Sequence, residues 1–311
     1  MKYQITSHSL AGGRATNQDR IAIVERDNAV LMVLADGLGG HEGGALAAEI
    51  LVQTVQHALE AVRQPIITKP SAFLALAIMQ AHKMIVARGA GMSPPISPRT
   101  TCVACLVQNG YAYWAHVGDS RLYHLRAGNV LVRTLDHTLT EQMHVGGLLS
   151  EEEMKKHPEK TRLLMAVGGP QAPSISLGEE CLLHTGDTLL LCTDGAWEAL
   201  PNDSLSRYIG YASLEEGVEE MLLAAEGRMK NKADNLSAIA FRWEDNVSAQ
   251  LPLQSEAARE TNHKTLIDDM HIKTAEKKLR PAKPDARAEG KKTLDESIDE
   301  LEAFLSKFEK H

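Results

Sequence analysis

Aromatic residues, basic charge and long apolar segments are all scarce in this chain. Phenylalanine, tryptophan and tyrosine make up 4% of its 311 residues, and the net charge is −8, so no nucleic acid is expected as a partner. No apolar run approaches the ~20 residues that a helix needs to span a membrane. The N-terminal sequence MKYQITSHSL lacks the apolar core of a signal peptide. These absences predict a cytoplasmic protein with no membrane partner.

Cysteine is rare as well, with four residues in the chain. Cys102 and Cys105 form a CxxC pair, but their odd spacing in an expected strand points them to opposite faces. Cys181 and Cys192 each stand alone in apolar sequence. We therefore expect four reduced core thiols, and favour this over a zinc site or a disulfide.

Apolar residues nevertheless make up 43% of the chain, enough for one large domain or two modest ones. The most informative stretch begins with the apolar run from Leu31 to Ala35, which is typical of a strand buried on both faces. The run stops at Asp36, and a carboxylate there is costly unless something pairs with it. Glycines follow, at positions 37, 39, 40, 43 and 44, and let the backbone approach a ligand closely. Taken by itself, this stretch is compatible with either a cation site or an ordinary Asp-Gly surface turn.

The remaining pattern is a mixture of helices and antiparallel strands. Amphipathic helices are predicted over about 46–62 and from Ser71 onwards, and a further helix over 213–229. Hairpin turns separate strands between 101 and 134, with no alternation of strand and helix. Residues 136–169 are irregular apart from a short acidic helix over 150–156. Further strands are expected at 3–9, 20–25, 175–184, 187–193 and 237–243.

Four more acids lie at expected strand ends. Asp119 and Asp194 follow strands, Asp234 precedes one, and Asp19 begins one after a polar loop. Carboxylates gathered at one rim would raise one another's pKa unless cations neutralised them. Oxygen ligands without histidine or cysteine favour Mg²⁺ or Mn²⁺ over Zn²⁺. Two such ions bridged by one carboxylate can activate water and hold a phosphoryl group.

Together these residues resemble a known family. Over about residues 1–244 the chain is similar to the PPM-type, metal-dependent protein serine/threonine phosphatases (protein phosphatase 2C), of the compact bacterial kind. Motifs occur in the family's order: Arg14-Ala15-Thr16-Asn17-Gln18-Asp19, Asp36-Gly37-Leu38-Gly39-Gly40-His41, Thr100-Thr101, Gly118-Asp119-Ser120-Arg121, Asp136-His137-Thr138, Thr193-Asp194-Gly195 and Asp234-Asn235. The resemblance implies an α+β fold, a four-layer αββα sandwich of two antiparallel β-sheets flanked by helices.

The resemblance also implies a metal centre with two Mn²⁺ or Mg²⁺ ions. Asp36 would bridge the ions, the Gly37 carbonyl would bind one of them, and Asp194 and Asp234 would complete the shell of the other. Asp119, with Asp194, matches a weaker third metal site.

Other positions carry roles around the metals. Asp19 would act through a bound water. Arg14 matches the catalytic arginine that binds the substrate phosphate, a role suited to a planar bidentate donor. The segment 138–162 matches a flap linked to substrate choice.

The chain departs from the family pattern near this site. Arg99 stands where glycine usually precedes the threonine pair, which is expected to stiffen that loop. Leu38 stands where many eukaryotic members have a histidine proposed as general acid, and His41 lies three residues further on. Either His41 or water would then protonate the leaving oxygen.

The C-terminal part differs in composition. Residues 1–245 are expected to form the phosphatase domain and 246–292 a charged flexible linker, with an amphipathic helix over 293–311. Thr293 and Glu296 fit a capping box. An apolar stripe needs a partner, which could be the chain's own domain, a second copy, or another protein such as a cognate kinase. The stripe consists of Leu294, Ile298, Leu301, Leu305 and Phe308.

The predicted function is hydrolysis of phosphoserine and phosphothreonine on proteins, opposing a bacterial serine/threonine kinase. One alternative is a weakly catalytic module that binds phosphoproteins, and another is a phosphatase for small phosphoesters. The complete carboxylate set favours catalysis over the binding module.

Overall fold

The computed structural model describes residues 1–39 and 42–245, without the side chains of Glu42 and Asn231. His41, the expected linker 246–292 and the expected helix 293–311 lie outside the described residues.

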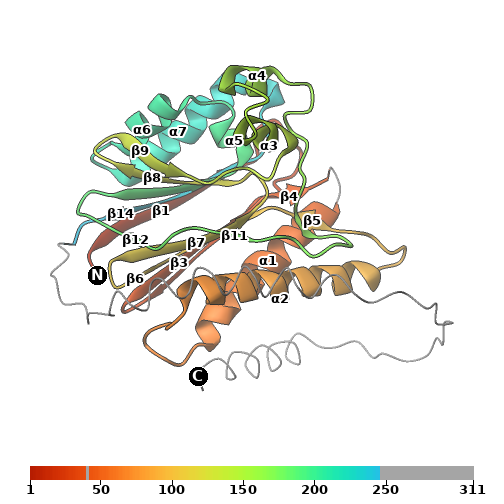
Figure 1. Ribbon diagram of the computed structural model, residues 1–311, viewed down its shortest axis with the longest axis horizontal. Coiled ribbons are helices and arrows are strands. Elements are labelled where there is room, and N and C mark those ends of the chain that lie inside the picture. The colour runs from red at the N-terminus through yellow and green to blue at the C-terminus, as the bar shows by residue number, and fades with distance from the viewer. Residues whose placement is uncertain (40–41, 246–311) are drawn as a thin grey trace. The chain divides into compact units, whose positions relative to one another are not determined.

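Two antiparallel sheets form the centre of the fold (Figure 1). The first has the strand order β1-β14-β13-β8-β9, and the second β11-β7-β6-β3-β2 with β12 also on β7. The first sheet contains β1 (Tyr3–Leu10), β8 (Arg121–Arg126), β9 (Asn129–Arg133), β13 (Thr188–Cys192) and β14 (Leu236–Trp243). The second contains β2 (Arg20–Arg26), β3 (Ala29–Ala35), β6 (Cys102–Gln108), β7 (Tyr111–Val117), β11 (Ser176–Leu177) and β12 (Cys181–Leu182).

Side-chain alternation along the strands builds three hydrophobic layers. In β3 every residue is buried: Leu31 and Val33 face a core formed with α1 (Glu42–Ala61) and α2 (Pro70–Ala90), and Met32 faces the other sheet. This explains the unbroken apolar run, because both faces of the strand are covered. The prediction of a doubly buried strand is confirmed.

Helices cover the outer face of the first sheet as well. There α5 (Asp194–Trp197), α6 (Asn202–Ile209) and α7 (Leu214–Met229) pack on residues such as Leu190 and Ala238. Figure 1 shows α1 and α2 on one outer side of the paired sheets and α5 to α7 on the other. The predicted αββα sandwich is therefore confirmed.

Residues 136–169 contain more order than the sequence predicts. They include α3 (Leu139–Val145) as well as the expected α4 (Glu151–Lys156) and the short strand β10 (Val167–Gly168). Ser150 and Glu153 form a complete capping box at the start of α4. Helix α6 was also not predicted.

The strand expected over 175–184 is wrong, because only β11 and β12 form there. Gly178 lies between them, against the Trp114 indole. A Cβ at this position would come 2.0 Å from Trp114 Nε1, so the close approach requires glycine. The strand is interrupted where the chain passes over this ring.

The cysteine prediction is largely confirmed. All four thiols are free, and Cys102 and Cys105 lie in different hydrophobic layers. Cys181 differs from the prediction because it is only half-buried, with its sulfur 3.5 Å from His124 Nδ1.

One described helix, α2, is long and apolar enough to cross a membrane by length and composition alone. This candidate span was not predicted from the sequence. Its buried residues, including Phe73, Leu74 and Ile78, pack in the core against the second sheet. Core helices pass the same test, so this is weak support for a membrane span.

Candidate metal centre

Asp36 lies where β3 ends and the two-residue strand β4 (Gly37–Leu38) begins. The Asp36 N–H donates to Thr101 Oγ1 (2.9 Å), and its carbonyl accepts from Thr100 Oγ1 and the Thr101 N–H (both 2.8 Å). Thr101 Oγ1 in turn shares a 2.7 Å hydrogen bond with Ser120 Oγ, beside Asp119. Buried hydroxyls therefore fix the backbone that carries the central carboxylate.

Both Asp-Gly pairs of the sequence need glycine for packing. A Cβ on Gly37 would lie 2.4 Å from the Gly44 backbone, where the chain enters α1. A Cβ on Gly195 would lie 2.2 Å from the Asn235 carbonyl. Each glycine lets a second chain segment come close beside the preceding aspartate.

Asp19 joins the centre from the loop before β2. It is almost fully buried, and Thr193 Oγ1 donates to its Oδ2 at 3.0 Å. The Ser237 N–H donates to the same threonine hydroxyl at 2.9 Å. Thr193 therefore holds Asp19 in place and directly precedes Asp194.

Asp234 and Arg14 form the exposed side of the centre. Arg14 Nη2 lies 2.7 Å from Asp234 Oδ2 in an ion pair open to solvent. Asn235 donates to the carbonyls of Ala11 and Thr16 and accepts from the Gln18 N–H. The amide of Asn235 therefore clamps the Arg14 loop against Asp234.

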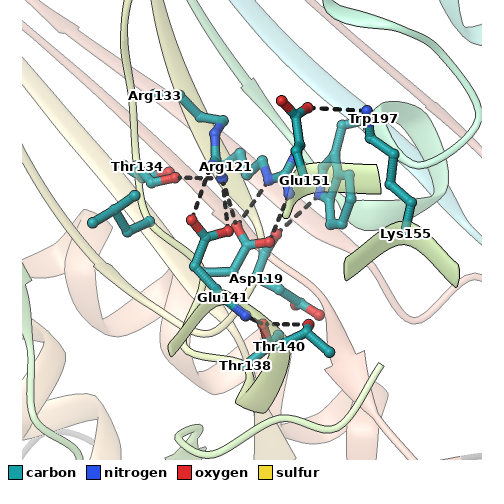
Figure 2. A network of polar contacts seen from close by, with 12 residues as sticks. Asp119, Arg121, Arg133, Thr134, Thr138, Thr140, Glu141, Glu151, Lys155 and Trp197 are labelled. Carbon is teal, nitrogen blue, oxygen red and sulfur yellow. Dashed lines mark hydrogen bonds and ion pairs between the residues drawn. The ribbon is translucent and has the colours of Figure 1, made fainter. Parts of the chain in front are cut away.

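Asp119 is connected to the flap by a polar network (Figure 2). Its carbonyl accepts from Trp197 Nε1 at 2.9 Å, and Arg121 stacks 3.3 Å above that indole. Arg121 makes a buried bidentate pair with Asp136, at 2.8 and 2.7 Å. Burial is the largest single effect on the pKa of Arg121 and lowers it, but the hydrogen bonds and charge of Asp136, together with Tyr123, outweigh burial and raise the pKa.

The network continues into α3. Arg133 pairs with Glu141 at 2.9 Å and also lies 3.6 Å from Asp136. Glu141 is buried, and its N–H donates to Thr138 Oγ1 at the start of α3. Ion pairs and aromatic stacking thus connect the flap to Asp119, and through Trp197 to the short helix that starts at Asp194.

A stacked histidine pair lies beside this network. The ring centroids of His116 and His137 are 4.8 Å apart. The Gly118 N–H donates to His137 Nδ1, so Nε2 carries the proton and donates to Ser176 Oγ. Burial lowers the pKa of both histidines, that of His137 to about 4. The pair is therefore neutral in the folded protein at neutral pH.

The carboxyl groups act on one another. Burial is the largest effect and raises the pKa of Asp36 and of Asp194 well above the ordinary value. The charge of Asp194 adds to the shift of Asp36, and that of Asp119 to the shift of Asp194. Burial also raises the pKa of Asp19 to about 6 and that of Asp119, with help from Asp136, to about 7. When ionised, these acids repel one another, so a cation held among them would stabilise their charged forms.

The donors fit hard divalent cations. Asp19 Oδ1 and Asp194 Oδ1 are buried and have no hydrogen-bond partner in the described part of the chain. Across residues 1–39 and 42–245, no three acidic, histidine or cysteine side chains form a ready-made metal cluster. A site that offers one or two carboxylates per ion suits Mg²⁺, because Mg²⁺ usually retains several coordinated water molecules in proteins. The structure brings the predicted acids into one region, with Arg14 at its edge.

Comparison with known proteins agrees with this architecture. The profile of the family Protein phosphatase 2C matches residues 6–237. A serine/threonine phosphatase of Listeria welshimeri is 28% identical over 242 residues, which cover 76% of this chain and 90% of the relative. The solved serine/threonine phosphatase of S. agalactiae is 26% identical with a TM-score of 0.72, over 78% of this chain and all of that one. The chain belongs to the protein phosphatase 2C family.

A second solved structure shares the fold. The catalytic domain of the serine/threonine protein phosphatase PstP, in complex with two manganese ions, is 24% identical with a TM-score of 0.65. The match covers 78% of this chain and 99% of that one.

Sequence reasoning named the acids but gave no role to the groups that position them. Thr100, Thr101, Thr193 and Asn235 all stand inside the quoted motifs. Each has a polar side chain close in sequence to a strand-terminal aspartate, and this could have indicated that it positions the acid. Glu141 had no comparable signal, because it stands in a segment predicted to be irregular.

Proposed function

We propose that this chain hydrolyses phosphoserine and phosphothreonine esters on proteins, with divalent cations held by the acids around Asp36. Membership of the family makes it a protein serine/threonine phosphatase, and the family depends on metal ions. The supporting observation is the group of buried carboxyls at strand ends, whose pKa values are raised by burial and by one another.

Each acid has a proposed role. Asp36 would be shared by two Mn²⁺ or Mg²⁺ ions, the Gly37 carbonyl would bind one of them, and Asp194 and Asp234 would bind the other. Asp119, together with Asp194, would hold a weaker third ion. The PstP catalytic domain in complex with two manganese ions supports two ions as the basic number. Bound cations supply an activated water near neutral pH and neutralise phosphoryl charge.

Further side chains of this chain act around the cations. Asp19, fixed by Thr193, orients a bound water with its free oxygen. Arg14 binds the substrate phosphate through its planar pair of donors. Its ion pair with Asp234 keeps it at the edge of the centre, and binding of a cation by Asp234 would release it for the phosphate.

The substrates are proposed to be phosphoproteins made by a cognate serine/threonine kinase. The tail beyond residue 245 is proposed to bring such a protein close, which raises its effective concentration without new contacts at the metals.

The test is phosphate release from a phosphothreonine peptide and from p-nitrophenyl phosphate, using the full chain near neutral pH. We expect turnover with Mn²⁺ or Mg²⁺, none with EDTA, and recovery when Mn²⁺ is restored. Full activity in chelator would contradict the metal assignment. Peptide binding without turnover would identify a phosphoprotein-binding module, and turnover of small esters alone would identify a retargeted phosphatase.

A further inference from the structure

A small sheet connects the Asp36 loop to the chain leaving the flap. Its central strand is β5 (Arg99–Thr100), which pairs with β4 on one side and β10 on the other. Figure 1 shows β4 and β5 side by side. In the register, Thr100 lies opposite Gly37, and Arg99 lies opposite Leu38 and Gly168. Arg99 is therefore one residue pair away from the proposed metal ligand Gly37.

The two residues of β5 point in opposite directions. Thr100 is fully buried and donates to the Asp36 carbonyl. Since successive strand side chains alternate, Arg99 faces away from Thr100, and it is exposed. One residue of this strand thus fixes the metal-binding backbone, and its neighbour presents a cation to solvent.

Arg99 packs over a glycine and has no acidic partner among the described residues. A Cβ on Gly169 would lie 2.9 Å from Arg99 Nε, so the arginine stem lies directly over this glycine. Gly169 has a φ of +74°, which favours glycine, and this keeps the space open. Within the described ranges, the Arg99 guanidinium has no ion pair and donates no hydrogen bond. Its donors are free for a ligand.

We infer that Arg99 is a specificity-determining residue that binds an anionic side chain of the substrate close to the phosphorylated residue. This inference rests on the proposed function. A planar guanidinium binds carboxylate and phosphate groups in the same bidentate way, so the ligand is an aspartate, a glutamate or a second phosphorylated residue.

The distance to the anionic residue follows from strand geometry. Neighbouring strands are ~4.8 Å apart, and an extended peptide advances ~3.3 Å per residue. A phosphorylated residue at the cations therefore brings residues two or three positions away to the neighbourhood of Arg99.

The experiment compares three phosphothreonine peptides with the full chain and Mn²⁺. One has alanine at the positions two and three residues from phosphothreonine on both sides, one has glutamate there, and one has phosphoserine there. The readout is kcat/KM for loss of the phosphothreonine phosphate, followed by mass spectrometry because phosphoserine is itself a substrate, for each anionic peptide divided by the same value for the alanine peptide. This ratio cancels any change in general activity.

We expect a preference of about fivefold for the anionic peptides, the upper end of what an exposed ion pair contributes. The preference should disappear in Arg99→Gln, which keeps a stem over Gly169, and survive in part in Arg99→Lys. A preference for phosphoserine alone would assign the ligand to a second phosphate, and equal preferences would assign it to either anion.

Arg63→Ala is the matched control. Arg63 is an exposed arginine without a described partner, beyond the C-terminal end of α1, a helix roughly 30 Å long. This variant should keep the wild-type ratio. Turnover of all three peptides without a preference, or with a preference that Arg99→Gln retains, would overturn the inference and leave the phosphatase function intact. No turnover of any peptide or of p-nitrophenyl phosphate would contradict the proposed function itself.

Discussion

Replacement of Asp136 by asparagine should destabilise the domain much more than loss of an exposed ion pair. The Asp136 carboxylate pairs with Arg121 through two bonds of 2.8 and 2.7 Å, and the side chains are 5% and 9% exposed. Asparagine keeps the shape but leaves a buried guanidinium without its counter-charge. Breaking a buried pair in this way costs about 3–5 kcal/mol. For a domain of this size the Tm should fall by roughly 10 °C.

The measurement is urea unfolding followed by circular dichroism, in EDTA so that metal binding does not contribute. Glu151→Gln is the control, because its pair with Lys155 spans 2.9 Å between side chains that are 61% and 67% exposed. This change should cost less than about 1 kcal/mol. If Asp136→Asn costs no more than the control, the network is not a structural element and the reasoning is wrong.

A double variant separates stability from function. Arg121→Met with Asp136→Leu removes both charges, and apolar replacement of a buried pair is often neutral for stability. The stack on Trp197, which supports Asp119, is lost as well. We therefore expect most of the stability to return while kcat stays below the wild-type value.

Three further predictions concern substrate binding, pH and the tail. Arg14→Ala should raise KM for a phosphopeptide more than it lowers kcat, and unchanged kinetics would contradict a role in phosphate binding. Burial lowers the pKa of His137 to about 4 and lowers that of His116. The unfolded chain therefore binds more protons at these two histidines below pH 6.5, so their contribution to stability should fall as the pH drops from 6.5 towards 4. The buried acids, whose pKa is raised, act in the opposite direction. His137→Gln should therefore lose less stability, or gain more, than the wild type over this range, and the same pH dependence in both proteins would refute the assignment. Truncation after Glu244 should preserve p-nitrophenyl phosphate turnover but weaken activity on the physiological phosphoprotein, and loss of folding would show that the tail belongs to the catalytic domain.

Elements with strong apolar periodicity could be predicted from the sequence. Strand β3 is apolar because helices cover one face and a sheet the other. Helix α3 was missed because the residues that it buries, Thr140 and Glu141, are polar. Glu141 is stabilised by its pair with Arg133 on β9. This pairing depends on tertiary packing, so the local apolar periodicity of the sequence does not indicate it.

In the candidate site, too, some residues could be predicted from the sequence and the contacts between them could not. Acids that end apolar strands stand out in the sequence, as Asp36 and Asp194 do. The contacts that position them join distant segments: Thr193 reaches Asp19, and Arg14 reaches Asp234. These pairings depend on how the strands assemble, so sequence patterns alone could not predict them.

The central claim is that the buried acids around Asp36 bind the cations on which phosphate release depends. Its most direct test is phosphate release from a phosphothreonine peptide by Asp36→Asn in saturating Mn²⁺. Asparagine matches the shape of the uncharged carboxyl that burial favours without metal, so the Tm in EDTA should stay close to that of the wild type. The account predicts a folded protein that releases almost no phosphate. Turnover near the wild-type rate would contradict it.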